Sequence, residues 1–178
     1  EAVAHGLGHA THTFNAMTGL NHRAPGVAGA ALTLPVTAEL IADTFHIHPG
    51  LFPLMVKAKG DKLCLITDCT RAGGLSDGEY SLGGQPIFVR GIECRLADGT
   101  IAGSVLKLNE AVRNMHNNYR RLPLHKAVKM ASLNPARAIG IDDRKGSLEE
   151  GKDADIFLAD ENMNVSRTIL RGRTIYQA

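Results

Sequence analysis

Two unbroken apolar runs, each leading into a helical or polar segment, constrain the fold of this chain more than any other feature. The first lies in TAELIADTFH (37–46), and a helical pattern follows it from Pro49. The second lies in KLCLITDCT (62–70), where four apolar residues in a row precede Thr67 and Asp68. Strands without polar alternation are buried on both faces, as parallel strands covered by helices are. The sequence therefore predicts an α/β fold with a parallel sheet.

The rest of the chain shows other patterns of apolar and turn-forming residues. Between residues 79 and 103, the turn pairs GG (83–84) and DG (98–99) flank a β-rich run, which predicts a hairpin insert. Helices are expected at about 106–119, 124–133 and 134–140. From residue 146 to 178, short apolar runs with polar breaks predict a small sheet.

Charge and composition exclude several classes of protein. The chain has 20 Lys and Arg against 18 Asp and Glu, so its net charge of +2 argues against a nucleic-acid partner. No apolar run reaches the roughly 18–20 residues that cross a bilayer, so no membrane partner is expected. The three cysteines, Cys64, Cys69 and Cys94, are odd in number and lack CxxC spacing. Free thiols favour a reducing compartment, and we expect a cytoplasmic protein.

The segment HATHTFNAM (9–17) resembles a strand that ends in histidine, threonine and an amide. Strand alternation would make His12 face away from Thr11 and Thr13. A histidine at the end of a buried strand is either a packed imidazole or a metal ligand, and the segment alone leaves both open.

All three predicted strands of the parallel sheet end in polar side chains. These are His12 with Asn15, Asp43 with His46, and Asp68 with Thr70. Functional side chains gather at the carboxyl ends of parallel strands, although an aspartate there is also a common turn cap. Histidine and carboxylate together hold zinc-type cations that activate water. We therefore expect His12 and Asp68 to share one cation and its water.

Asp68 suits the role of general base in such a site. A bound cation lowers the pKa of water from 15.7 to about 7, so a nearby carboxylate takes the proton at neutral pH. The protonated acid then delivers the proton to a leaving group. The chain has no GxSxG elbow, P-loop or GxGxxG fingerprint that would indicate a different chemistry.

Seven segments follow one another along the chain: THTFNAM, RAPGVAGA, ELIADTFHIHP, KLCLITDCT, DGTIAGS, NPARAIG and KGSLEEGKDADIFLAD. They occur in the order seen in N-acetylglucosamine-6-phosphate deacetylases of the metal-dependent amidohydrolase superfamily, and the chain resembles that family along its length. The last is shared by many amidohydrolases. The succession THxFNAM, IADxxH and TDxT is much more specific.

The resemblance implies roles for individual residues. His12 matches a metal-ligating histidine, and Asp68 matches the catalytic aspartate that serves as base and then as acid. Arg23 matches an arginine that reaches the substrate phosphate, typically across a homodimer interface. Without the family, Arg23 is equally well an ordinary surface residue, and Asp43 equally well orients His46. Further substrate contacts are implied for Asn15, Ala16, Asp43, His46, Ile101, Ala102 and Gly103.

The resemblance also implies an architecture and a cofactor. Residues 1–145 match the C-terminal portion of a (β/α)8 TIM-type barrel with a hairpin insert at about 79–103, and residues 146–178 match C-terminal strands of a small β-sandwich. The family binds a divalent metal, with zinc preferred over iron, manganese or cobalt. It also uses a glutamate and an earlier histidine, which we expect in a preceding part of the same polypeptide. We therefore expect the 178-residue chain to be inactive alone.

The implied reaction is hydrolysis of the acetamide of N-acetylglucosamine 6-phosphate to glucosamine 6-phosphate and acetate, in amino-sugar catabolism. Three alternatives stay open at this point. The substrate is instead N-acetylgalactosamine 6-phosphate, or it is a cyclic amide, or the chain only binds a phosphosugar without catalysis.

Overall fold

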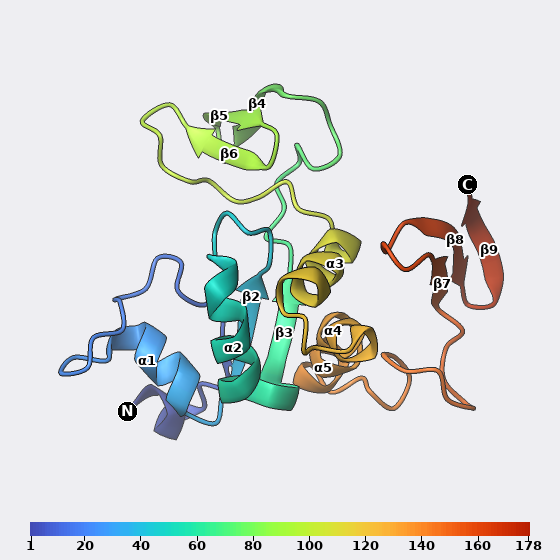
Figure 1. Cartoon of the computed structure of the whole chain (residues 1–178), viewed down its shortest axis with the longest axis horizontal. Coiled ribbons are helices and arrows are strands. Elements are labelled where there is room, and N and C mark those ends of the chain that lie inside the picture. The colour runs from blue at the N-terminus through green and yellow to red at the C-terminus, as the bar shows by residue number, and fades with distance from the viewer.

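A computed structural model of residues 1–178 shows three separate three-stranded sheets (Figure 1). The first sheet consists of β1 (His9–Ala10), β2 (Thr37–Ile41) and β3 (Leu63–Ile66), which are parallel and adjacent in that order. Helices lie between and after these strands along the chain. The predicted α/β class with a parallel sheet is therefore confirmed.

The helices cover the parallel sheet and provide most of the core. They are α1 (Gly26–Thr33), α2 (Phe52–Lys59), α3 (Leu108–Asn118), α4 (Leu124–Ala131) and α5 (Leu133–Ala138), with short 3-10 turns at Ala2–His5, Pro49–Leu51 and Gly60–Lys62. The core consists of 18 buried residues, among them Leu40 of β2, Phe52 and Met55 of α2, Leu63 of β3 and Met115 of α3. Burying such side chains contributes roughly 1.5–3 kcal/mol each, which holds the helices on the sheet.

The second sheet is a meander that interrupts the chain between β3 and α3. Its strands are β4 (Gly78–Leu82), β5 (Gln85–Arg90) and β6 (Glu93–Leu96), paired antiparallel. Gly83 and Gly84 form the first turn with φ of 58° and 83°, a conformation that glycine adopts without a steric penalty. The hairpins predicted here are therefore present, and Figure 1 shows them set apart from the parallel sheet.

The third sheet closes the chain. It is formed by β7 (Ile156–Ala159), β8 (Val165–Leu170) and β9 (Arg173–Gln177), again antiparallel. All three strands were expected from the short apolar runs. Every residue of β9 is exposed, including Ile175 and Tyr176.

Two strands, β1 and β2, are shorter than the sequence indicates. β1 stops at Ala10, and His12 lies in a turn with a φ of 31°, so strand alternation does not set its direction. The predicted strand 37–46 ends at Ile41, because Asp43 begins a turn by accepting hydrogen bonds from the backbone N–H groups that follow it.

None of the helices combines the length and the apolar character that crossing a membrane requires.

Candidate functional site

The three parallel strands end at one edge of their sheet, and a predicted site residue follows each. His12, Asp43 and Asp68 lie two residues beyond the ends of β1, β2 and β3, respectively. Because β2 lies between β1 and β3, the turn of Asp43 is flanked by the turns of His12 and Asp68. This edge is where α/β folds place functional side chains. The strand order thus brings the three predicted turns together.

His12 combines a strained backbone with an unpaired ring nitrogen. Its φ of 31° is accompanied by 80° at Phe14 and 53° at Ala16 in the same turn. Such conformations cost about 1–3 kcal/mol each in non-glycine residues and persist only where other contacts hold them. The Nδ1 atom of His12 is buried and has no hydrogen-bond partner. A buried imidazole nitrogen without a hydrogen-bond partner, at the end of a strand, is available to bind a metal ion.

The residues present fit one coordination position of a metal centre. Nowhere in the chain do three or more His, Cys, Asp or Glu side chains group closely enough to hold an ion. His12 fits a single position, since an imidazole nitrogen without another partner is an ordinary zinc ligand. The other ligands of a complete centre are not gathered around it.

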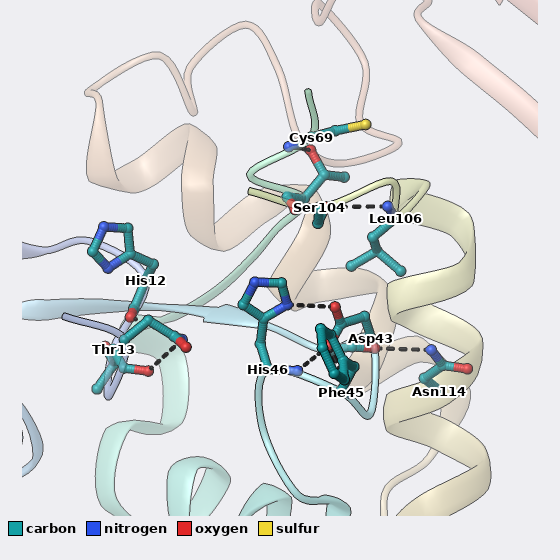
Figure 2. A network of polar contacts seen from close by, with 12 residues as sticks. His12, Thr13, Asp43, Phe45, His46, Cys69, Ser104, Leu106 and Asn114 are labelled. Atoms are coloured by element: carbon teal, nitrogen blue, oxygen red, sulfur yellow. Dashed lines mark hydrogen bonds and ion pairs between the residues drawn. The ribbon is translucent and has the colours of Figure 1, made fainter. Parts of the chain in front are cut away.

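Asp43 and His46 form a buried pair in the turn after β2 (Figure 2). Their side chains are 3% and 4% exposed, and Oδ2 of Asp43 lies 2.6 Å from Nδ1 of His46. Oδ1 accepts hydrogen bonds from the backbone N–H groups of Phe45 at 2.9 Å and His46 at 2.8 Å. A carboxylate only accepts, so Nδ1 of His46 carries the hydrogen. Both oxygens of Asp43 are therefore occupied, whereas Nε2 of His46 is left for another partner.

Arg95 and Asn114, which are distant in the sequence, contact the turn that carries this pair. The ring of Phe45 packs edge-on against His46 with centroids 5.6 Å apart, and Cζ of Arg95 lies 4.9 Å from the centre of the Phe45 ring. Nδ2 of Asn114 in α3 donates to the carbonyl oxygen of Ala42 at 2.9 Å. Sequence reasoning missed Arg95 and Asn114. No local motif marks either one, because their roles depend on the packing of the hairpin insert and α3.

Asp68 is an exposed acid in a tightly held turn. Its side chain makes no hydrogen bond or ion pair within the chain, and its φ is 49°. The turn is fixed through its backbone, because Ser104 donates its N–H to the Asp68 carbonyl at 2.9 Å and its hydroxyl to that of Thr67. Thr70 in turn donates its N–H to the Ser104 carbonyl at 2.9 Å. Asp68 thus offers a free carboxylate on a rigid support.

The predicted loop 101–103 lies against the Asp68 turn. At Gly103 a Cβ would stand 3.2 Å from the Asp68 carbonyl oxygen and 2.7 Å from Cγ2 of Thr70, and the φ of this residue is +63°. Only glycine fits this approach. Ile101 is 40% exposed, whereas Ala102 is buried in the small core of the hairpin insert. The loop therefore presents Ile101 and its own backbone at this end of the sheet.

The remaining predicted residues lie along the segment between β1 and α1. Nδ2 of Asn15 donates to the His12 carbonyl at 3.3 Å, which closes the turn, and Ala16 is exposed. Arg23 is exposed in a separate turn, where its backbone N–H donates to Oδ1 of Asn21 at 3.1 Å. Its guanidinium forms no ion pair with any other predicted site residue. Figure 1 shows the segment that leads into α1 extending away from the sheet.

The cysteines near the site are not activated as nucleophiles. Burial, together with the negative charge of Glu39, raises the pKa of the Cys64 thiol to about 11. Burial also raises the pKa of Cys69 in the turn after β3. Both thiols are therefore protonated at neutral pH, and the thiolate is the reactive form.

Comparison with known proteins places these features in context. Residues 1–175 match the amidohydrolase family model. The chain is 45% identical to N-acetylglucosamine-6-phosphate deacetylase of Bacillus subtilis (strain 168), over 99% of this chain and 45% of that protein. It is 41% identical to N-acetylgalactosamine-6-phosphate deacetylase of Escherichia coli O157:H7, over 97% of this chain and 45% of that protein.

A solved structure is similar over the same extent. The crystal structure of a mutant N-acetyl-D-glucosamine-6-phosphate deacetylase from Mycobacterium smegmatis, in complex with N-acetyl-D-glucosamine-6-phosphate, superimposes with a TM-score of 0.89. That match has 35% sequence identity and covers 97% of this chain and 46% of the other. The chain therefore spans about half the length of the relatives it matches.

Proposed function

The chain belongs to the amidohydrolase family, and from this premise we propose that the protein carrying it hydrolyses the acetamide of N-acetylglucosamine 6-phosphate. The products would be glucosamine 6-phosphate and acetate, as amino-sugar catabolism requires. The observation that supports this most directly is the presence, at one edge of the parallel sheet, of a buried His12 nitrogen without a hydrogen-bond partner and an exposed Asp68 carboxylate, on the turns that flank the Asp43 turn.

The architecture that we propose is part of a larger barrel. Residues 1–145 would form the last strands and helices of a (β/α)8 barrel with its hairpin insert, and residues 146–178 would form strands of a β-sandwich. Three adjacent parallel strands with intervening helices support the first assignment, and the separate antiparallel sheet supports the second.

Asp68 would carry the proton transfers of the reaction. Its carboxylate would take a proton from the attacking water, whose oxygen forms a bond to the acetamide carbon. It would then give that proton to the amine nitrogen as the carbon–nitrogen bond breaks. A divalent cation held in part by His12, zinc before iron, manganese or cobalt, would supply Lewis acidity for the carbonyl. An exposed carboxylate without partners is free to act in this way.

The substrate would lie across the three strand ends. Nε2 of His46 is free to contact the amino sugar, because Asp43 engages Nδ1. Asp43 itself would act by orienting His46, since both of its oxygens are occupied. Asn15 and Ala16 would contact the sugar phosphate from the first turn. Residues 101–103 would close over the sugar from the hairpin side.

Arg23 would bind the phosphate of a substrate in a neighbouring subunit of a homodimer. Its exposed position in the segment that extends from the sheet, without an ion pair in its own chain, supports this proposal. Guanidinium groups bind phosphate through two parallel hydrogen bonds. The three cysteines are unpaired, which supports a reducing compartment such as the cytoplasm for this reaction.

The test is Asp68→Asn in the full-length protein, with release of acetate from N-acetylglucosamine 6-phosphate as the assay. We expect kcat to fall by about 10²–10⁴-fold, the usual contribution of general acid–base catalysis. Asp143→Asn is the matched control, because Asp143 is exposed and makes no ion pair. A kcat within a few-fold of the wild-type value in Asp68→Asn would refute the role of Asp68.

N-acetylgalactosamine 6-phosphate is a second candidate substrate, favoured by the 41% identity to the Escherichia coli O157:H7 enzyme of that name. The two substrates differ only in the orientation of one hydroxyl group. The ratio of their kcat/KM values, measured side by side, assigns the substrate, because it compares the two transition states directly.

A further inference from the structure

Glu39 is an acid in the middle of β2 with no role in the reaction described above. Its neighbours Ala38 and Leu40 are fully buried in the core, and strand alternation places Glu39 on the opposite face of the sheet. Its side chain is 19% exposed. A carboxylate buried to this extent needs hydrogen-bond partners, or it would destabilise the fold.

Those partners all come from the short segment that carries His12. Oε1 of Glu39 lies 2.8 Å from Nε2 of His9, and Oε2 accepts the hydroxyl of Thr11 at 2.6 Å. The same Oε2 accepts the backbone N–H of His12 at 3.3 Å. The carbonyl oxygen of Glu39 accepts the N–H of Thr13 at 2.9 Å. One residue of β2 therefore holds four of the five residues from His9 to Thr13.

These contacts replace a strand ladder that is almost absent. β1 has only two residues paired with β2, and beyond Ala10 the chain leaves the sheet. His12 then adopts its left-handed conformation, which costs free energy unless surrounding contacts hold it. The bond from the His12 N–H to Glu39 acts directly on the strained residue.

We propose that Glu39 is a positioning residue that fixes the turn after β1 and thereby aims the imidazole of His12 at the metal site. This inference rests on the proposed function, in which His12 is a metal ligand. Groups that orient a ligand are worth about 10–100-fold in metal affinity.

The test is the zinc affinity of Glu39→Gln in the full-length protein, measured by competition with a chromogenic chelator. Glutamine keeps the size of the side chain, but its NH2 group cannot accept a hydrogen bond. We expect zinc to bind about 10–100-fold more weakly than to the wild type. Glu79→Gln is the matched control, since Glu79 is exposed on β4, and its zinc affinity should be unchanged.

Thr11→Val provides a second, milder variant if Glu39→Gln fails to fold. It removes only the 2.6 Å hydrogen bond from Thr11 to Glu39, and we expect a smaller loss of zinc affinity in the same direction. The absorption spectrum of the Co²⁺-substituted protein reports ligand geometry in the folded state. A role in folding alone would lower the unfolding midpoint and leave both the spectrum and the zinc affinity unchanged.

Zinc affinity within about threefold of the wild type, with an unchanged Co²⁺ spectrum, would overturn the role of Glu39. That result leaves the proposed function intact, because the wild type still binds zinc. A wild-type protein that binds no zinc would instead overturn both proposals.

Discussion

Removing the carboxylate of Asp43 should destabilise the protein strongly, because three hydrogen bonds converge on a side chain that is 3% exposed. Asp43→Ala leaves two backbone N–H groups and the Nδ1–H of His46 without acceptors. Breaking a buried charged contact of this kind costs about 3–5 kcal/mol. Asp43→Asn keeps Oδ1 with both backbone bonds, and the imidazole can accept from the new amide. Its cost should be about 1 kcal/mol.

The assay is urea denaturation of the full-length protein, followed by circular dichroism, which reports the loss of its helices and strands. Asp143→Ala is the control, and it should leave the unfolding midpoint unchanged because Asp143 is exposed and unpaired. The reasoning would be refuted if Asp43→Ala cost less than about 1 kcal/mol. It would also be refuted if the Asn and Ala variants lost the same stability, since the backbone bonds would then contribute nothing.

Three further predictions concern other parts of the site. Gly103→Ala places a Cβ 2.7 Å from Cγ2 of Thr70 at a φ of +63°. This substitution should lower the free energy of unfolding in urea by about 2–4 kcal/mol, and an unchanged midpoint would contradict the geometry. The folded-state pKa of Cys64 is raised to about 11, so the stability linked to its protonated thiol is present below the ordinary thiol pKa and is lost as pH rises toward 11. Cys64→Ala should therefore lose less stability than the wild type between pH 9 and 11; equal losses would show that Cys64 does not contribute. Arg23→Leu should raise KM by about 10–100-fold with little change in kcat, and an unaltered KM would exclude contact with the phosphate.

Much of the secondary structure can be predicted from the sequence, because strands and turns depend mainly on residues that are close together in the chain. The four apolar residues of 63–66 form β3, and the pair Gly83–Gly84 forms the turn between β4 and β5. The spacing of Asp43 and His46 in one turn also indicates their contact. Such features depend on neighbours in the chain, and patterns of apolar and turn residues report them directly.

The features that sequence reasoning missed depend on contacts between distant segments. Glu39 holds the His12 turn only because β2 pairs with β1 in the observed register. Arg95 reaches Phe45 from the hairpin insert, about fifty residues later in the chain. The strand-like pattern of residues 9–17 overstates the length of β1, which stops at Ala10, so strand alternation does not set the direction of His12. Contacts across the sheet override local β-propensity there.

The most direct test of the proposed chemistry is anomalous diffraction at the zinc absorption edge from crystals of the full-length, zinc-loaded protein. We expect a peak about 2.0–2.1 Å from a ring nitrogen of His12, with the Asp68 carboxylate within reach of the same bound water. A peak elsewhere in the molecule, or one at His12 with Asp68 turned away from it, would contradict the shared site.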